Sequence, residues 1–441
     1  MKVGIIGGGA LGLGAAWELV QQGHQPVVYE RAPFLGGQAS TFDVGGAPLE
    51  RAYHHLFTSD TAILELAEEV GLGHKMRWID SKMGIFRNGK IYKFVTPTDL
   101  LKFSAIPLID RIRMGFVALY LSRYKNWRKL ENVTASDWIR KYAGPRAYDA
   151  VWGPLLRGKF GEYYDKVAMP WFWGKMHTRF TSRGKGMAKE KLGYPGGSFG
   201  EIFDRTAELI REKGGEVHID AGVNKVLIED GVARGLEVEL PGQGAKEENF
   251  DVVLATVPSY IFPKLVPPLP ADYLAKLEGI KYLAAVLIVL ELDQPLSSVY
   301  WLNIADNSIP FVGVIEHTNF IEPEVYGGNH IVYIANYLSS EHPLFHMKDT
   351  ELLEEYLPHL QRINPNFDRS WIRKWHYHRV AAAQPVVEVN YSQRIPDFQT
   401  PFDNLYLANT TQIYPEDRGT NYSVRLGREM ANRIISDHKG D

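Results

Sequence analysis

Three glycines near the start of the chain are spaced for binding the pyrophosphate of a dinucleotide. The stretch Val3–Ile6 is short and apolar, as expected of a buried strand, and Gly7, Gly9 and Gly12 follow it in a GxGxxG pattern. In such a motif the first glycine permits a tight turn, the second lets a pyrophosphate approach the backbone, and the third allows close packing of helix on strand. The pattern predicts a nucleotide site at the first turn of the fold.

The elements around these glycines fit such a site. Residues 13–23 read LGAAWELVQQG, which predicts a helix with small residues on its sheet-facing side, and the strand-like run 27–30 ends on Glu30. The first helical turn, with Ala10 and Leu11, would offer amide donors and a partial positive charge to the phosphates. Glu30 stands where a carboxylate can accept hydrogen bonds from ribose hydroxyls.

A second glycine turn follows the acid. Gly36 and Gly37 suggest another close approach of bare backbone to a long, extended ligand. The cofactor-binding residues expected in this stretch are Glu30, Arg31, Gly36, Gly37, Gln38, Ala39 and Ser40.

With these motifs the chain resembles the FAD-dependent amine oxidase superfamily, which includes monoamine oxidase, protoporphyrinogen oxidase, phytoene desaturase and UDP-galactopyranose mutase. The shared signature flanks the GG pair with arginines, and here Phe34 and Gln38 stand in their place. The resemblance is strongest, through YHHLF, WFWGKM, IEHTNF and EDRGTNYSV, to the bacterial protoporphyrinogen-oxidase-like FAD-dependent oxidoreductases. It implies FAD as the cofactor, bound non-covalently.

Two middle segments resemble further parts of the family's nucleotide domain. In residues 194–231 a helix precedes a strand in which Val223 would touch the adenine through its main chain. Residues 250–258, which include the cofactor candidate Thr256, resemble the strand that completes the sheet.

The C-terminal segment resembles the family's closing flavin motif. Ala408-Asn409 stands where the family usually has Gly-Asp or Gly-Glu, so an uncharged amide replaces the acid. Thr420 and Asn421 fall where the start of the last helix would meet the N1 and O2 edge of the flavin. A helix N-terminus at that edge stabilises the negative charge that arrives with a hydride.

The stretch RAYHHLF carries candidate catalytic groups. In related flavoproteins the segment at this place runs from the adenine end toward the isoalloxazine ring. Neighbours in an extended strand point to opposite faces, so we expect only one of His54 and His55 to face the flavin, where it would hydrogen-bond the ring or move a proton. Tyr53 is a candidate substrate contact.

Two further stretches have the character of cavity wall. GVIEHTNF places Glu316, a catalytic candidate, next to the substrate candidates His317 and Asn319; one Glu-His pair is no convergent ligand set, so no metal site is predicted. WHYHRVAAAQPV carries Arg379, a catalytic candidate, and Gln384, a substrate candidate. In the superfamily such a segment comes close to the flavin; the other interpretation is a turn before the last nucleotide-domain strand.

The segment between residues 152 and 183, rich in aromatics and cations, leaves two interpretations open. Arg157, Lys159, Arg179 and Arg183 could attract an anionic substrate. They could equally be surface charges that lie over tryptophan faces.

The predicted fold class is α/β, with a Rossmann-like FAD-binding domain and an interleaved α+β substrate domain, as in amine-oxidase-like flavoproteins. Residues 1–80, 185–265 and 395–441 would form the FAD-binding domain, and residues 81–184 and 266–394 the substrate domain. A single GxGxxG in strand context gives no sign of a separate NADPH domain.

The composition of the chain limits the kinds of chemistry and of binding partner that we expect. The 441 residues include no cysteine, which excludes disulfides and thiolate catalysis, and a net charge of -3 gives no electrostatic case for nucleic-acid binding. A cysteine-free chain fits a reducing compartment, and we expect the protein in the cytoplasm. No uncharged apolar run is long enough to span a membrane; residues 103–124 form either a partly buried helix or a segment that attaches to a membrane surface. The oligomeric state is left open.

Together these features predict an FAD-dependent oxidoreductase. It would remove a hydride equivalent from a C-N or C-C bond of a small organic molecule and pass the electrons to oxygen, a quinone or another acceptor. Two alternatives remain at this point. One is a mutase of the UDP-galactopyranose type, which uses reduced flavin without net redox change, and the other is a flavin-binding protein without catalysis.

Overall fold

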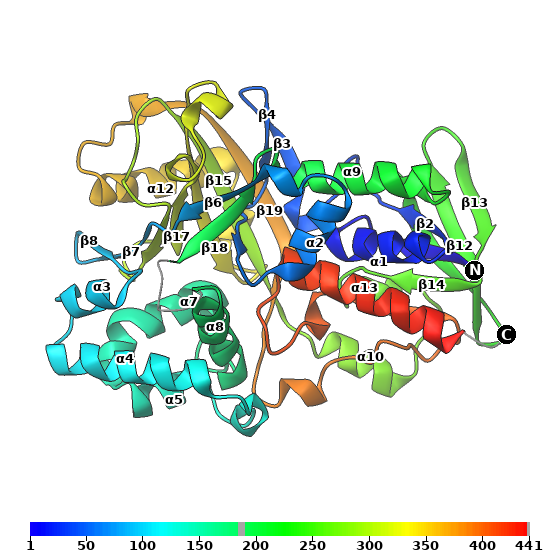
Figure 1. Ribbon diagram of the computed structural model, residues 1–441, viewed down its shortest axis with the longest axis horizontal. Coiled ribbons are helices and arrows are strands. Elements are labelled where there is room, and N and C mark those ends of the chain that lie inside the picture. Colours follow the sequence, from blue (N-terminus) through cyan, green and yellow to red (C-terminus); the bar gives the residue numbers. More distant parts are fainter. Residues whose placement is uncertain (184–189, 439–441) are drawn as a thin grey trace.

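The computed structural model describes residues 1–183 and 190–438. In Figure 1 the elements form two units side by side. One unit surrounds a parallel sheet, on the right of the view, and carries both termini at its far end. The other combines a mixed sheet with a group of helices, on the left.

Five parallel strands form the first sheet. In spatial order they are β10 (Glu216–His218), β2 (Gln25–Tyr29), β1 (Lys2–Ile6), β14 (Val252–Ala255) and β20 (Leu405–Leu407). In the central strand Val3 pairs with Val252 on one side and with Pro26 on the other. The strands are nearly continuous apolar runs because both faces of the sheet are covered.

The two faces of this sheet carry different layers. The helical layer consists of α1 (Ala10–Gln21), α2 (Thr61–Glu69), α9 (Ser198–Glu212) and α13 (Thr420–Asp437), and the opposite layer is the meander β11 (Gly222–Glu229), β12 (Val232–Leu240) and β13 (Gly244–Asn249). Val3 and Ile5 pack in the core under the helices, whereas Ile6 packs in the core under the meander. This alternation is the two-residue period of a strand.

Seven strands form the second sheet. In spatial order they are β19 (Ile372–Pro385), β15 (Tyr282–Leu292), β18 (His330–Leu338), β17 (Gly313–Glu316), β16 (Trp301–Ile304), β7 (Met83–Arg87) and β8 (Lys90–Lys93). Val286 and Ile288 of β15 pack in the core that includes α12 (Asp349–Ile363), and Leu287 points to the core shared with the first unit.

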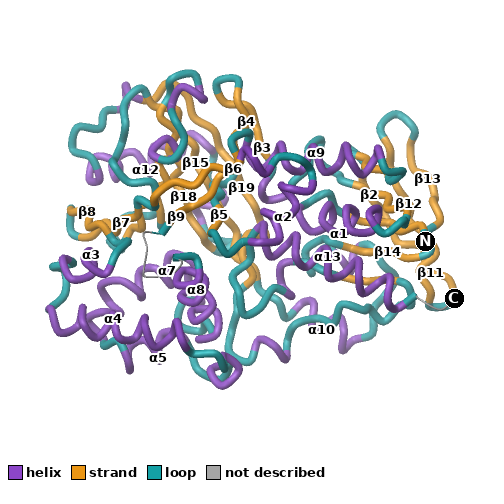
Figure 2. Tube along the Cα trace, in the orientation of Figure 1, coloured by secondary structure: helices purple, strands orange, loops and turns teal. Residues whose placement is uncertain are grey.

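A group of helices lies beside the second sheet. Its members are α3 (Pro97–Lys102), α4 (Leu108–Arg123), α5 (Ala135–Tyr142), α6 (Pro145–Ala147), α7 (Gly153–Phe160) and α8 (Met169–Thr181). Figure 2 shows these helices gathered apart from the strands at the lower left of the view. They share their own core, which is built from large side chains such as Trp138, Tyr148 and Trp171.

Small elements complete the two units. They are the ribbon β3 (Thr41–Val44) and β4 (Ala47–Glu50), the sheet β5 (Leu56–Phe57), β9 (Lys191–Pro195) and β6 (Met76–Asp80), and the helices α10 (Ala271–Glu278) and α11 (Pro343–His346). β9 pairs with both β5 and β6, so the stretch that carries the two histidines is tied to a segment far along the chain.

The expected N-terminal elements are present. The strand, glycine turn, helix and strand at the N-terminus are confirmed as β1, α1 and β2. Of the two interpretations of the stretch around Gln384, the turn does not hold, because β19 continues to Pro385, where it pairs with Tyr282 after a shift of register. All five strands of the parallel sheet come from the three segments assigned to the FAD-binding domain, although the domain boundaries themselves remain a prediction.

Candidate active site

The first glycine turn has the shape that a pyrophosphate needs. A Cβ atom on Gly7, whose φ is +112°, would lie 2.5 Å from Thr256 Oγ1, and one on Gly12 would lie 2.0 Å from the Gly7 carbonyl oxygen. Gly9 is different, because the nearest atom to its would-be Cβ is the Cα of Gly37 at 3.9 Å. No side chain caps α1 at this end. The start of α1, with Ala10 and Leu11, is therefore bare backbone with open space beside it, which fits an anionic group.

The second glycine turn lies against the first. The amide of Gly36 donates to the Gly8 carbonyl at 2.9 Å, and Gly36 and Gly37 have φ values of +91° and +56°. Such values favour glycine. Ala39 and Ser40, which end this turn, are buried. Both turns thus present backbone at one place, as predicted for a long ligand.

Glu30, Arg31 and Val223 lie at the same end of the parallel sheet. Glu30 Oε2 accepts the amide of Gly8 at 2.8 Å, and its other oxygen accepts a backbone amide two residues on. Arg31 is exposed, and its Nε would lie 3.8 Å from a Cβ on Gly222. Val223 stands beside a bulge in the pairing of β11 with β12, where the ladder is interrupted. A ribose and an adenine could be bound by these groups.

Thr256 and Asn409 tie the strand ends together. Thr256 Oγ1 donates to the Ile6 carbonyl at 2.8 Å. Asn409 is 4% exposed, its Nδ2 donates to the Val257 carbonyl at 2.9 Å, and its Oδ1 accepts the amide of Thr411 at the same distance. Its side chain is therefore used inside the protein, and it holds the loops that follow β14 and β20.

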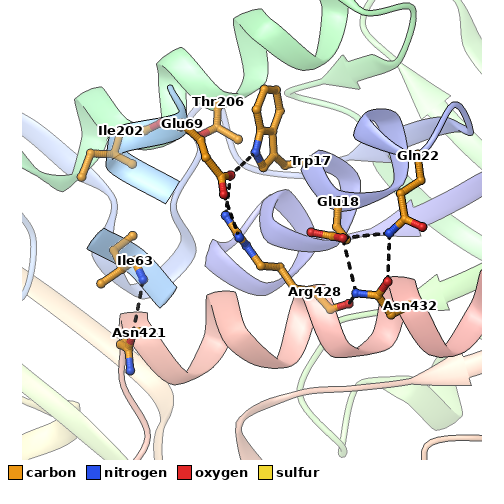
Figure 3. A network of polar contacts seen from close by, with 10 residues as sticks. All are labelled: Trp17, Glu18, Gln22, Ile63, Glu69, Ile202, Thr206, Asn421, Arg428 and Asn432. Carbon is orange, nitrogen blue, oxygen red and sulfur yellow. Dashed lines mark hydrogen bonds and ion pairs between the residues drawn. The ribbon is translucent and has the colours of Figure 1, made fainter. Parts of the chain in front are cut away.

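The start of α13 is fixed by contacts with α1 and α2, which Figure 3 shows. The Oδ1 atom of Asn421 accepts a backbone amide of α2 at 3.2 Å, and Thr420 beside it is 8% exposed. Further along the helix, Arg428 makes two hydrogen bonds to Glu69, at 3.0 and 2.6 Å, and Trp17 Nε1 donates to the same carboxylate at 2.6 Å. These contacts hold the helix N-terminus in place.

A large cavity of about 560 Å³ lies where the start of α13 meets the second sheet and the helices α3, α4, α7 and α8. Five predicted site residues line it, namely Tyr53, His54, His55, Thr420 and Asn421. Gln38 lines a small adjoining pocket together with Tyr53 and His54, and its Nε2 donates to the Ala382 carbonyl at 3.0 Å. Segments far apart in the sequence thus meet at one site.

Both histidines line the cavity, whereas neighbours in a regular strand would point to opposite faces; which of them faces the flavin stays a prediction. The physical reason that both line it is that β5 begins only at Leu56, and the residues before it form an irregular bend. His54 Nδ1 lies 2.6 Å from the Ala52 carbonyl, and His55 Nδ1 lies 3.2 Å from the Tyr300 hydroxyl. Burial lowers the pKa of His54 to about 4 and that of His55 to about 3, so both are neutral near pH 7.

Several charged or ionisable residues of the cavity wall were not predicted, among them Tyr337, Asp417 and Arg418. Arg418 Nη2 donates to the Tyr337 hydroxyl at 3.0 Å, and its Nε donates to Gln384 Oε1 at 3.1 Å. Burial alone would raise the pKa of Tyr337, but Arg418 and Lys159 lower it to about 8. The sequence offered one local hint of this group: the charged pair Asp417 and Arg418 directly precedes Gly419, the N-cap residue of α13.

The comparisons with known proteins agree with this geometry. The family model described as flavin containing amine oxidoreductase matches residues 12–435. The chain belongs to this family. A candidate flavin-containing monoamine oxidase of Mycobacterium tuberculosis is 25% identical over 62% of this chain, and the match spans 61% of that relative.

Other family members match over the whole chain. A 15-cis-phytoene desaturase of Glycine max is 22% identical to this chain. The match covers 99% of this chain and 80% of the desaturase. The solved structure of a candidate protoporphyrinogen oxidase from Exiguobacterium sp. superposes with a TM-score of 0.77, at 18% identity and with 99% of both chains covered. The chain thus belongs to a family of flavin-containing oxidoreductases and has the predicted two-part fold.

The predicted site residues of the stretch GVIEHTNF do not line the cavity. Glu316 accepts the amides of Leu296 and Ser297 at 2.9 and 2.5 Å, so it holds a loop. His317 Nε2 lies 2.8 Å from the Tyr326 hydroxyl, and Asn319 donates to two backbone carbonyls. None of the three lines the cavity. The polar residues at this strand end satisfy buried backbone, which sequence alone could not distinguish from a site.

Arg379 and Gln384 have different places. Arg379 is exposed on β19, donates to the Phe345 carbonyl at 3.1 Å, and lies over the Phe345 and Tyr377 rings, away from the cavity. Gln384 is 1% exposed and reaches the cavity wall only through its bond with Arg418. The geometry therefore supports a positioning role for Gln384 and no contact of Arg379 with a ligand.

Residues 1–183 and 190–438 contain neither a metal-ligand cluster nor a membrane-spanning helix. Within these ranges no group of three or more His, Asp or Glu side chains is arranged to hold a metal ion. Among the helices in the same ranges, none has the length and apolar character required to cross a membrane.

Proposed function

We propose that this oxidoreductase binds FAD non-covalently and takes a hydride equivalent from a C-N or C-C bond of a largely apolar organic molecule. The main observation that supports this proposal is the cavity of about 560 Å³. It ends at the buried N-terminus of α13, and Thr420 and Asn421 lie on its wall. When bound, FAD supplies the redox chemistry. The protein binds and orients both molecules and excludes water.

The chain's own residues divide these tasks. The bare backbone at Gly9 and Gly37 would bind the pyrophosphate, and Glu30 would accept hydrogen bonds from the ribose. The first amides of α13 would stabilise negative charge on the flavin edge. His54 and His55, neutral near pH 7, would hydrogen-bond without bringing a charge.

Proton transfer, where the substrate requires it, would fall to groups whose pKa lies closer to neutral. Tyr337, with a pKa of about 8, can hold or release a proton at its phenol oxygen. Asp60 is the second such group, because burial raises its pKa to about 6. Both side chains line the cavity. Oxygen, a quinone or another acceptor would then take up the electrons.

The experiment that tests this function is an anaerobic visible spectrum of the purified holoenzyme, recorded with a panel of amines, amino acids, porphyrinogens, polyenes and NAD(P)H. Bleaching by one class establishes the oxidoreductase and names its substrate type, and readmitted air then separates an oxidase from a dehydrogenase. Absence of bleaching, with isomerisation of a sugar nucleotide by the dithionite-reduced enzyme, would establish the mutase instead. A flavin that no compound reduces would indicate a binding protein.

The assignment of Glu30 has its own test. Glu30→Ala removes the acceptor for the ribose and for two backbone amides, so this variant should purify with far less FAD than the wild type. Glu229→Ala, which removes an exposed acid at the end of β11, is the matched control and should retain the cofactor. Full FAD occupancy in Glu30→Ala would refute the assignment.

A further inference from the structure

The cavity that is lined mostly by apolar groups also carries an excess of cations. Its apolar side includes large residues on several elements, among them Leu155, Trp171, Phe172, Phe180 and Trp301. The charged residues on the wall are five cations and two acids, namely Lys159, Lys175, Arg179, Arg183, Arg418, Asp60 and Asp417.

Two of the cations share one carboxylate. Lys159 Nζ and Lys175 Nζ lie 3.2 and 2.7 Å from the same oxygen of Asp417. That carboxyl also accepts Trp171 Nε1 at 3.0 Å. Although burial acts in the opposite direction, Lys159 and Lys175 hold the pKa of Asp417 well below its usual range. Asp417 is therefore fully ionised, and it can neutralise only one of the two ammonium groups.

Arg179, on α8, and Arg183, just after it, have hydrogen-bond donors without a partner. In the described ranges the Arg179 guanidinium makes no hydrogen bond or ion pair, and its charge acts on His55 and on Arg183. Arg183 donates from Nη2 to the Val95 carbonyl at 2.8 Å, while its buried Nε has no hydrogen-bond partner. Burial lowers the pKa of Arg183, and Glu190 is the acid that opposes this. An unpaired, partly desolvated guanidinium is costly unless an anion binds it.

Since it deepens the proposed function, the following inference rests on it. We propose that the substrate is an apolar molecule with an anionic head, a carboxylate or a phosphate, which Arg179 and Arg183 bind. The apolar body lies along the tryptophan and phenylalanine side chains of the cavity. A protonated amine of the same shape would meet like charge on this wall and would bind more weakly.

The test uses the holoenzyme and three probes with a common apolar body: 1-naphthaleneacetate, 2-(1-naphthyl)ethanol and 2-(1-naphthyl)ethylamine. Binding is read from the visible spectrum of the bound flavin. We expect the acid to bind at least about tenfold more tightly than the amine, with the alcohol between them. Arg179→Gln and Arg183→Gln should each weaken binding of the acid by about tenfold and leave the alcohol unchanged.

Two controls make the outcome unambiguous. Arg179→Lys retains the charge and should keep most of the affinity, and Arg373→Gln changes an exposed arginine of β19 outside the cavity and should have no effect. Tighter binding of the amine, or unchanged acid binding in both Gln variants, would overturn the inference. A flavin-loaded enzyme that amines bleach would overturn it while the proposed function stands, whereas a protein without flavin would overturn the proposed function.

A second and independent observation concerns the outer side of α3 and α4. Seven of the eleven large hydrophobic side chains exposed in the described ranges lie between residues 101 and 120. They are Leu101, Leu108, Ile109, Ile112, Phe116, Leu119 and Tyr120, with Ile109 and Phe116 exposed to 65% and 68%. Leu101 lies on α3, and the spacing of the other six places them along one side of α4. Such a concentration marks an interaction surface.

The charges around this surface indicate its partner. Exposed cations surround it, namely Lys93, Lys102, Arg113, Arg123, Lys125, Arg128 and Lys129. The only acids between residues 93 and 129 are used internally, since Asp99 caps α3 and the buried Asp110 pairs with Arg146 at 2.6 Å. Leu119 of this surface also lines the cavity, together with Leu100, Met114 and Ala118 of the same helices.

We infer that this face of α3 and α4 docks on a bilayer surface that contains anionic lipids. The apolar side chains enter the region between headgroups and acyl chains, and the cations bind the lipid phosphates. The cavity behind the helices would then receive an apolar substrate from the bilayer.

Co-sedimentation of the holoenzyme with vesicles tests this surface. We expect strong binding to phosphatidylcholine vesicles that contain phosphatidylglycerol, weaker binding without it, and at least about tenfold weaker binding for the double variant Ile109→Glu and Phe116→Glu. Ile219→Glu changes an exposed apolar residue elsewhere and should bind as the wild type does. Absence of vesicle binding, or a concentration-dependent dimer that the double variant dissociates, would overturn the inference.

Discussion

At the scale of single residues, burial decides the protonation state of several acids. Glu50 is completely buried, and it accepts the Tyr194 hydroxyl at 2.7 Å and the amide of Phe199 at 2.8 Å. These hydrogen bonds favour the ionised form, but burial outweighs them and raises the pKa of Glu50 to about 7. The folded protein therefore holds a proton that the unfolded chain releases near its ordinary pKa.

This difference makes stability depend on pH in a predictable direction. The Glu50 contribution is fully present below the ordinary pKa of about 4.5 and is lost as pH rises through about 7. Glu50→Gln keeps the acceptor for Phe199 and cannot ionise, so it should lose less stability than the wild type between pH 5 and pH 8. The expected difference is at most about 3 kcal/mol. Denaturant unfolding at both pH values measures it, and an equal loss in the two proteins would contradict it.

The geometry of the glycine turns could be predicted because it is local, whereas Tyr337 and Arg418 on the cavity wall could not be predicted. Gly9 and Glu30 act through positions set by one turn and one strand. Arg418 meets Tyr337 across 81 positions of the chain, and that contact depends on how two units pack. Arg379 was assigned to the site from a nearby motif, but the side of β19 on which it lies is set by pairing with β15.

At the scale of elements, α1 and α13 approach so closely that glycine is required between them. A Cβ atom on Gly427 would lie 2.2 Å from the Leu11 carbonyl oxygen and 2.8 Å from the Ala15 amide nitrogen. A Cβ on Gly14 would lie 3.1 Å from the Val424 carbonyl oxygen. Since α1 begins at the pyrophosphate site and α13 begins at the cavity, this contact sets the distance between the two ends of the cofactor site.

Gly427→Ala should therefore destabilise the protein and weaken cofactor binding together. The atoms it meets belong to the backbone, so the helices must separate, at a cost of about 1–3 kcal/mol that exceeds the gain of about 1 kcal/mol in helix propensity. Thermal unfolding and the FAD content of the purified variant measure both effects. Gly115→Ala on α4 is the control, because its nearest neighbour is a leucine methyl at 3.8 Å and it should be neutral or stabilising. Equal behaviour of the two variants would contradict the argument.

The elements themselves were easier to predict than their connections. Apolar runs such as Val3–Ile6 predicted strands, because a buried strand needs little beyond apolar side chains. The course of β19 was not predicted, since its last residues contain alanine and proline and remain extended only because β15 lies beside them.

At the scale of the whole molecule, the chain crosses between the two units several times, and the proposed cofactor site takes residues from three distant segments. The pyrophosphate turns lie near the N-terminus, Val223 lies in the middle of the chain, and α13 lies at its end. A ligand that touches all three stabilises only the complete fold, so its binding energy adds to the stability of the folded state. A ligand that contains only one part of the cofactor would stabilise the folded state much less.

Flavin addition to the cofactor-depleted protein should therefore raise its unfolding temperature in a ligand-specific way. FAD at about a thousand times its dissociation constant should add about 4 kcal/mol. FMN lacks the adenosine that Glu30 and Val223 would bind, and it should give a far smaller shift. Differential scanning fluorimetry compares the two flavins, with NAD as a dinucleotide that lacks the isoalloxazine ring. Equal shifts with FAD and FMN would contradict the adenosine site, and an equal shift with NAD would contradict a site built around α13. The Glu30→Ala variant should lose most of the difference between FAD and FMN, because that difference resides at the adenosine end.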